Sequence, residues 1–317
     1  MTVINIFHSP DPVIKKIVRG EMGTVEALET LEQRHETQPM AGVRDSATVT
    51  AALWELNLLI GLSEVKRVVE EIKAYVEIQQ KRLTHHLKCD PLVLHMIFKG
   101  NPGTGKTTVA RILGKLLSGL GVLSKGQLIE AERADLVGEY IGHTAQKTRA
   151  LIQKAMGGIL FIDEAYSLGR GGDKDFGKEA IDVLVKGMED YRNDFVLVLA
   201  GYRREMEYFM RINPGFHSRF PIQITFPDYS ISELMDIAVM MATERHYRFS
   251  PQARQVMQAY LTEQFVRQAN NFSNARLVRN LLEKAIRRQA LRLSKLTEPT
   301  REELLTIEAV DLGGEGK

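Results

Sequence analysis

One eight-residue stretch constrains the fold more than any other part of the 317-residue chain. Residues 100–107 read GNPGTGKT and fit the phosphate-loop pattern G-x-x-x-x-G-K-[ST]. A mostly apolar run at 92–98 precedes this stretch, and residues 108–117 have the apolar spacing of a helix. Because a phosphate loop works between a strand and the start of a helix, the order predicts an α/β fold with a nucleotide site at this loop.

Each part of the loop has a distinct expected task. Its backbone N–H groups form a nest for phosphate oxygens, because glycines allow the backbone to curl inward. The Lys106 ammonium reaches the β- and γ-phosphates, and the Thr107 hydroxyl is placed to ligate Mg²⁺. We therefore expect a nucleotide and Mg²⁺ as cofactors, with these nucleotide-binding residues: Asn101, Pro102, Gly103, Thr104, Gly105, Lys106, Thr107 and Thr108.

A second acidic motif lies further along the chain. Residues 158–165 read GILFIDEA, an apolar strand that ends in two carboxylates. Ligands bind at the carboxyl edge of open α/β sheets, so acids at that edge favour a catalytic role over a solvated strand end. Asp163 is expected to hold Mg²⁺, directly or through water, and Glu164 to polarise the attacking water.

Composition narrows the class of protein. Apolar residues make up 44% of the chain and charged residues 26%, as in soluble globular proteins. The formal net charge of +2 argues neither for nor against nucleic acid. A single cysteine, Cys89, excludes an internal disulfide and fits a reducing compartment. No apolar run is long enough for a membrane span, and the N-terminus does not resemble a signal peptide, so we expect a cytoplasmic protein.

The remaining pattern divides the chain into four parts. Residues 1–50 carry weak signals and are expected to form a partly ordered N-terminal extension. Residues 51–228 alternate strand-like and helix-like runs, with further strands expected at 127–131, 195–200 and 221–227. Residues 229–312 change to helix upon helix, and 313–317 form a tail.

Three features remain open from pattern alone. Residues 60–62 either belong to a core-packing segment or contact a nucleotide base, and periodicity favours the core. Tyr140 and Ile141 lie between two glycines, so they either tuck into the core or contact something outside. Arg219 is most simply a surface arginine, and the basic series after residue 275 is most simply a solvated helix face.

Phosphate loop, acid-ended strand, arginine turn and helical lid, in this order, resemble an AAA+ ATPase. The resemblance covers residues 50–312, and its most specific stretches are 95–107, 136–144 and 158–166. It implies a five-stranded parallel sheet between helices, followed by a small helical lid domain. Within the family, the chain resembles the branch that holds the stage V sporulation protein K ATPases and the red-type Rubisco activases. The sequences of residues 130–137 and 175–182 resemble the sporulation group in particular.

The resemblance also implies residue roles that pattern alone does not give. Ile60, Gly61 and Leu62 match the seat of the adenine, and Arg276 matches the sensor 2 arginine that touches the γ-phosphate. Arg219 matches the arginine finger that completes a neighbouring subunit's site. Tyr140 and Ile141 match the pore loop that grips a polypeptide client. The sensor 1 position holds Ala-Gly-Tyr at 200–202, so no sensor 1 residue is assigned.

These roles lead to an expected function. We expect an ATP-hydrolysing remodelling ATPase that forms a homo-oligomeric, hexameric ring and acts on a protein client in spore maturation. A red-type Rubisco activase and an ATP-dependent assembly switch or scaffold are the alternatives. A DNA-loading ATPase is disfavoured, because the charge is near neutral and no DNA-binding module is recognisable.

Overall fold

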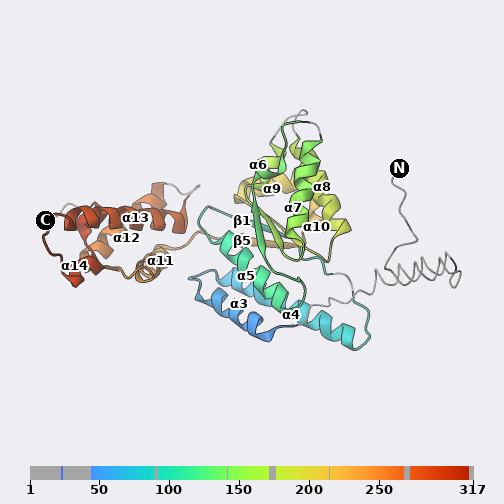
Figure 1. The fold of residues 1–317 in the computed structure, drawn as a ribbon, viewed down its shortest axis with the longest axis horizontal. Helices are drawn as coiled ribbons and strands as arrows, with labels where there is room; N and C mark the ends of the chain where they lie inside the picture. The colour runs from blue at the N-terminus through green and yellow to red at the C-terminus, as the bar shows by residue number, and fades with distance from the viewer. Residues whose placement is uncertain are drawn as a thin grey trace.

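A five-stranded parallel sheet organises the first part of the chain, in the order β2-β3-β4-β1-β5 (Figure 1). The strands are short and, apart from the edge strands, almost wholly buried: β1 Met96–Gly100, β2 Leu128–Ala131, β3 Ile159–Ile162, β4 Val196–Gly201 and β5 Ile222–Phe226. Continuous apolar runs of this kind are typical of parallel sheets that are covered on both faces. The computed structural model describes residues 23, 44–89, 92–140, 142–170, 176–213, 215–267 and 272–313.

Side chains alternate across the sheet, so each strand supplies two separate apolar layers. Met96 and Phe98 of β1 point into one layer and Ile97 into the other. The first layer packs against α3 Ser46–Leu58, α4 Ser63–Thr84 and α5 Lys106–Gly119. The second packs under α7 His143–Ala155, α8 Gly177–Asp190 and α9 Arg203–Ile212 (Figure 1). The short elements α6 Arg133–Leu136, η2 Ala165–Gly169 and α10 Phe216–Arg219 complete this side.

The phosphate loop has the predicted local structure. β1 ends at Gly100 and α5 begins at Lys106. The residue before α5, Gly105, has φ +96°, a conformation that glycine adopts without steric cost. The loop is therefore able to turn sharply and present its amides at the start of the helix.

The first described helix begins earlier than the expected start of the α/β domain. α3 starts at Ser46, where the Asp45 side chain accepts a hydrogen bond from the Ala47 amide and caps the helix. Val49 packs into the core beside α5. Residues 46–50, assigned from sequence to the extension, are thus part of a core helix, whereas 1–22 and 24–43 lie outside the described residues.

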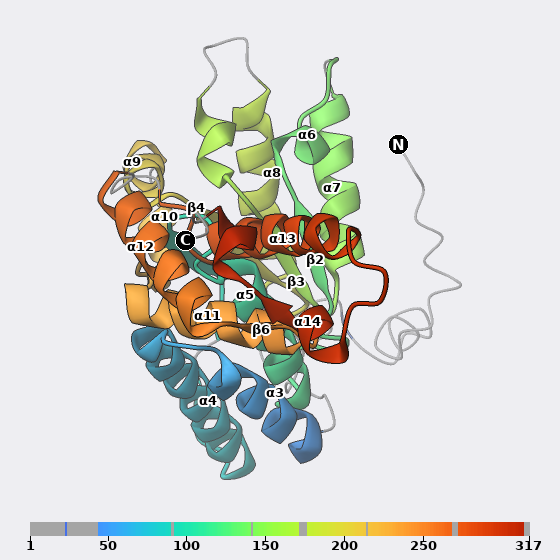
Figure 2. The ribbon, with the colours of Figure 1, turned by 90° about the vertical axis from the view of Figure 1, so that its left-hand side faces the viewer.

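Helices dominate the second part of the chain, which faces the viewer in Figure 2. The capping box between Ser230 and Glu233 starts α11 Ile231–Thr243, and Pro251 opens α12 Pro251–Arg267. The series ends with α13 Asn274–Leu293, α14 Arg301–Leu305 and η3 Ala309–Leu312. Two strands of two residues each, β6 Arg248–Phe249 and β7 Thr306–Ile307, pair in parallel; the sequence did not predict them. Residues 314–317 of the expected tail lie outside the described residues.

Part of the basic face of α13 is not solvated as expected. Both Nε and Nη2 of Arg292 pair with the carboxylate of Asp311, at 3.0 and 2.9 Å. Asp311 is buried and belongs to η3, which lies against α13. This arginine therefore joins η3 to α13 within the lid. No helix in the described ranges is both long and apolar enough to cross a bilayer.

Candidate functional site

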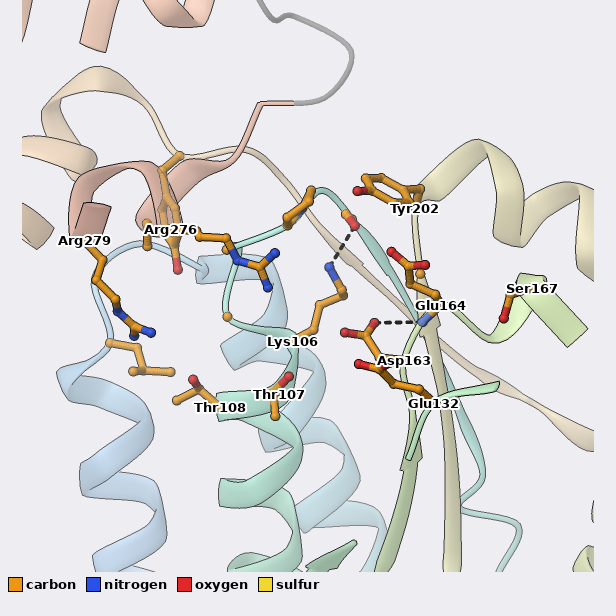
Figure 3. A pocket seen from close by; sticks show the side chains of 18 of the residues that line it. Lys106, Thr107, Thr108, Glu132, Asp163, Glu164, Ser167, Tyr202, Arg276 and Arg279 are labelled. Atoms are coloured by element: carbon orange, nitrogen blue, oxygen red, sulfur yellow. Dashed lines mark hydrogen bonds between the residues drawn. The ribbon is translucent and has the colours of Figure 1, made fainter. Parts of the chain in front are cut away.

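An open cleft of about 1200 Å³ lies at the carboxyl edge of the sheet, between the phosphate loop and the lid (Figure 3). Strand ends, loop and lid helices all contribute to its wall. The sequence-predicted residues among those that line it are Pro102, Gly103, Gly105, Lys106, Thr107, Thr108, Asp163, Glu164 and Arg276. The cleft therefore brings together the two motifs that the sequence placed about 60 residues apart.

The Lys106 side chain folds back over its own loop. Its ammonium donates hydrogen bonds to the carbonyl oxygens of Gly100 at 2.9 Å and Asn101 at 2.8 Å. Burial lowers the pKa of Lys106, and the nearby Asp163 carboxylate partly opposes that shift. A partly desolvated ammonium gains from an anion in the cleft, which suits this group to hold a phosphate.

Two acids stand at the end of β3. The Glu164 amide donates to the Asp163 Oδ1 atom at 2.9 Å, and this bond fixes one of the two carboxylate oxygens of Asp163. Glu164 has φ +46°, a left-handed conformation that is uncommon for residues other than glycine. The turn directs the two carboxylates into the cleft, as Figure 3 shows.

The donor set at this edge fits Mg²⁺. The Thr107 hydroxyl and the Asp163 carboxylate both line the cleft and both offer oxygen. Mg²⁺ prefers oxygen ligands, and it is usually bound by one or two carboxylates together with substrate phosphates and water. Thr107 and Asp163 are the residues that would hold such an ion.

Two side chains at the same edge were missed by sequence reasoning. Glu132 follows β2, and Tyr202 follows β4, where no sensor 1 residue was assigned; both line the cleft. Burial raises the pKa of Tyr202, and the Glu164 carboxylate adds to the shift. In Figure 3 the Tyr202 ring lies close to Glu164. The rule that ligands bind where parallel strands end would have identified both residues once the strands were known.

The apolar wall of the cleft includes part of the expected adenine seat at 60–62. Ile60 lines the cleft together with Leu59, whereas Gly61 and Leu62 are not among its described lining residues. Leu62 is buried, and Gly61 packs against the lid residue Glu233. The wall is completed by three residues of α11: Ile237, Met240 and Met241. A base would therefore meet side chains from both parts of the chain.

The side chains of two predicted nucleotide-binding residues, Asn101 and Thr104, bond within the protein and do not face the cleft. The Asn101 side chain turns away from the cleft and bonds to Asp228, and Thr104 is fully buried with its hydroxyl donating to the Asn101 carbonyl at 2.8 Å. The side chains of Asn101 and Thr104 therefore hold the loop in shape, and these two residues have only their backbone amides left to bind a ligand.

The lid supplies two arginines to the cleft. Arg276 and Arg279 lie one turn apart on α13, and both line the cleft. Arg276 points toward Lys106 in Figure 3. The sequence singled out Arg276 through the family resemblance but left Arg279 in the solvated face, because spacing alone does not tell which side of a helix meets a ligand.

Comparison with known families agrees with this geometry. Residues 96–228 match the model described as "ATPase family associated with various cellular activities (AAA)", and residues 230–316 match the AAA lid domain. The chain belongs to the AAA+ ATPases. The cleft is formed where the AAA domain meets the lid domain.

Individual AAA+ relatives share most of the chain. Stage V sporulation protein K of Bacillus subtilis (strain 168) is 58% identical over 259 residues, covering 81% of this chain and 80% of that protein. Protein CfxQ of Xanthobacter flavus is 48% identical over 236 residues, or 74% of each chain, and protein CbbX of Cereibacter sphaeroides is 48% identical over 74% of this chain and 76% of that protein. The crystal structure of the FIGL-1 AAA domain in complex with ADP shares the fold, with a TM-score of 0.56, 17% identity and 81% of each chain covered.

Two sequence-predicted residues of this AAA+ chain lie away from the cleft. Arg219, on α10, is not among the described residues that line the cleft; its guanidinium pairs with the Glu189 carboxylate at 2.6 Å. Tyr140 is 66% exposed on the segment between α6 and α7, where its ring packs edge-on against His143. Ile141, predicted beside it, lies outside the described residues.

Proposed function

We propose that this AAA+ ATPase assembles into a hexameric ring and uses ATP hydrolysis to remodel a protein client in spore maturation. The 58% identity with a stage V sporulation protein supports the cellular role. We expect this work to take place in the cytoplasm. The cleft supports the chemistry, and two exposed side chains outside it support assembly and client contact.

Within the cleft, the chain's own residues divide the work. Loop amides and Lys106 bind the phosphates, while Thr107 and Asp163 hold Mg²⁺, which neutralises part of the phosphate charge. Glu164 orients the attacking water and accepts its proton. Arg276 contacts the γ-phosphate from the lid, and Leu59 and Ile60 pack on the base.

The observation that carries the ring is the position of Arg219. The guanidinium sits on α10, outside the cleft of its own chain, and is held by Glu189 on the neighbouring α8. An arginine finger contributes about 10³–10⁵ in rate in phosphoryl-transfer systems, and here a second copy of the chain has to supply it. Exchange of Glu189 for a phosphate oxygen is feasible, because an exposed ion pair contributes only about 0–1 kcal/mol.

Mixing two inactive variants tests shared sites. Arg219→Ala keeps an intact cleft but has no finger, and Glu164→Gln keeps the finger but cannot activate water. We expect each alone to lose ATPase activity, about 10³-fold or more for Arg219→Ala. Their mixture should regain activity, because some interfaces pair an intact cleft with an intact finger.

The same experiment has a matched control and a clear contradiction. Arg211→Ala removes an exposed arginine from the nearby α9 and should leave the rate unchanged. A wild-type rate per subunit that does not depend on protein concentration, together with no recovery in the mixture, would show that each chain works alone. The ring would then be excluded.

Tyr140 supports a polypeptide client. An aromatic ring that is 66% exposed in a loop between glycines is able to grip a chain that passes through a central channel. We expect Tyr140→Ala to retain the ATPase rate of the purified protein and to fail to restore spore maturation in cells that lack the gene. Tyr208→Ala is the matched control, because Tyr208 is 63% exposed on α9. Full restoration by Tyr140→Ala would refute the pore-loop role.

An activase-like remodeller is the second candidate, because relatives named CfxQ and CbbX share 48% identity with the chain. An ATP-dependent switch or scaffold is the third, and Glu164→Gln separates it from both motors. That variant should bind ATP without hydrolysing it, so a switch stays active in cells while a remodelling motor stops.

A further inference from the structure

A buried asparagine joins the lid to the rest of the chain. Asn274, the first residue of α13, is fully buried and has φ +46°, a left-handed conformation that asparagine tolerates better than most residues. Its Nδ2 group donates to the Asp228 Oδ1 atom at 2.7 Å and to the Phe272 carbonyl at 2.9 Å. Its Oδ1 atom accepts the Tyr229 amide at 2.9 Å. Both the donor and the acceptor group of this side-chain amide are thus hydrogen-bonded, as is usual for buried polar groups.

The carboxylate of Asp228 is shared between the lid and the phosphate loop. Besides the Asn274 amide, it accepts the Asn101 Nδ2 group, at 3.0 Å to Oδ1 and 2.9 Å to Oδ2. Asp228 follows β5 and belongs to neither the loop nor the lid helix. Hydrogen bonds to an ionised acceptor are about twice as strong as neutral ones, so this carboxylate is a strong junction between the two.

The backbones of loop and lid also touch directly. The Ala275 amide donates to the Gly103 carbonyl at 3.2 Å, and the Tyr229 hydroxyl donates to the Thr104 carbonyl at 3.3 Å. A Cβ atom on Gly103 would lie 2.4 Å from the carbonyl oxygen of Ser273 and 2.7 Å from the Arg276 amide. The loop and the start of α13 therefore cannot move independently without breaking this contact.

Asn101 of the phosphate loop also contacts Lys106. The Asn101 carbonyl accepts the Lys106 ammonium at 2.8 Å, while its side chain bonds to Asp228. A phosphate that draws Lys106 into the cleft would remove this bond from Asn101, whose side chain contacts Asp228 and, through it, Asn274. Arg276 is two residues beyond Asn274, on the first turn of the same helix. One continuous set of contacts thus runs from the phosphate-binding lysine to the lid arginine.

We propose that Asp228 and Asn274 are positioning residues of the ATPase reaction, whose paired side chains place Arg276 according to the state of the phosphate loop. The inference rests on the proposed role of Arg276 at the γ-phosphate. The pair acts through Arg276 and Lys106 and does not itself touch the nucleotide.

A swap of the donor and acceptor tests the pair. Asn274→Asp places two carboxylates at the present 2.7 Å contact and should lower kcat for ATP hydrolysis by about tenfold or more, since small displacements of catalytic groups have large effects. Adding Asp228→Asn restores a donor and an acceptor at that contact, while the bond to the Phe272 carbonyl stays lost in both variants. The double variant should therefore recover part of the loss. A double variant no more active than Asn274→Asp, or an Asn274→Asp variant with wild-type kcat and KM, would overturn the proposal.

A milder substitution distinguishes an effect on folding from an effect on the position of Arg276. Asn274→Gly keeps the left-handed backbone accessible and removes only the side chain, so it should fold, as judged by circular dichroism and Tm. We expect it to reduce kcat more than it raises KM. A folded Asn274→Gly with unchanged kcat would contradict the proposal.

A binding comparison distinguishes positioning from a structural contact. The Asp228→Asn, Asn274→Asp and double variants form a cycle that measures coupling between the two residues. We expect stronger non-additivity in Kd for a non-hydrolysable ATP analogue than for ADP, because only the former offers the γ-phosphate that Arg276 contacts. Equal coupling for both nucleotides would mean a structural contact and would refute the proposal.

The activity of Arg276→Ala, compared with that of the Asn274 variants, shows whether this inference fails alone or together with the proposed role of Arg276. Loss of activity in Arg276→Ala with wild-type behaviour of the Asn274 variants would overturn the inference and leave the role of Arg276 intact. Wild-type activity of Arg276→Ala would end the proposed role of Arg276 and this inference with it.

Discussion

Glu164, at the edge of the cleft, adopts a backbone conformation that costs free energy. Its φ and ψ are +46° and +39°, and it directly precedes η2. A left-handed residue with a Cβ atom costs about 1–2 kcal/mol relative to the right-handed form. Strain of this kind tends to be kept where it positions a functional group, and here it turns the carboxylate into the cleft.

This strain predicts that two Glu164 variants differ in stability although both lose activity. Glu164→Gly should be more stable than Glu164→Ala by about 1 kcal/mol, because glycine has no Cβ atom to strain the left-handed conformation. Both variants should lose ATP hydrolysis, since neither carries a carboxylate. Urea denaturation measures the difference, with Glu164→Gln as the control that keeps side-chain size. Equal midpoints for the Gly and Ala variants would show that the backbone carries no strain.

Among the secondary-structure elements, strand β1, which lies between β4 and β5, is preceded by a buried histidine. His95 is 3% exposed, and its Nδ1 atom accepts the Leu197 amide from the neighbouring strand β4 at 3.0 Å. The ring lies near those of Phe195 and Phe220, with centroids 5.8 and 6.3 Å away. Burial lowers the pKa of His95 from 6.5 to about 4, so the native state holds a neutral ring.

Acid should therefore weaken the fold through this residue. The unfolded chain binds the proton first, because its pKa near 6.5 is above the folded value. The stabilisation is complete above pH 6.5 and is lost progressively as the pH falls through about 4, by about 3 kcal/mol in full. In His95→Asn the amide oxygen is able to accept the same hydrogen bond without titrating. The fall in unfolding free energy between pH 7 and pH 4.5 should be smaller in this variant, and an identical fall would assign the acid loss to other groups.

At the scale of the whole molecule, nucleotide binding links the α/β domain to the lid. The apolar core of the sheet continues into the lid through Tyr229 and Leu234, and the cleft takes residues from both parts. A ligand that binds only the folded chain stabilises it by about 2.7 kcal/mol at a concentration 100 times its Kd. Binding should therefore stabilise both parts together.

Heating the protein with ATP and without it checks this link. The wild type should show a single transition that moves to a higher Tm with ATP. Lys106→Ala should lose most of that shift, because a charged hydrogen bond to phosphate contributes about 1.5–3 kcal/mol. Lys125→Ala, an exposed lysine in the loop before β2, is the control and should keep the full shift. An ATP-dependent shift that survives in Lys106→Ala would place the nucleotide elsewhere.

Local sequence patterns determined much of this protein. The start of α5 at Lys106, the buried strand before Asp163 and the lid helices all follow from motifs, glycine positions and apolar spacing. These features depend on residues close together in the chain, so their physical causes can be read from a few neighbours. The five-stranded parallel sheet came from the family resemblance, and the structure confirms it.

Only the tertiary structure decided which distant side chains meet. The orientation of the lid on the sheet decides the Asp228–Asn274 contact, the position of Arg279 in the cleft and which of residues 59–62 line its wall. No local pattern encodes that orientation, because periodicity tells which face of a helix is apolar but not which element covers it. It is set by the packing of residues far apart in sequence, where burial forces each polar group to find its partner.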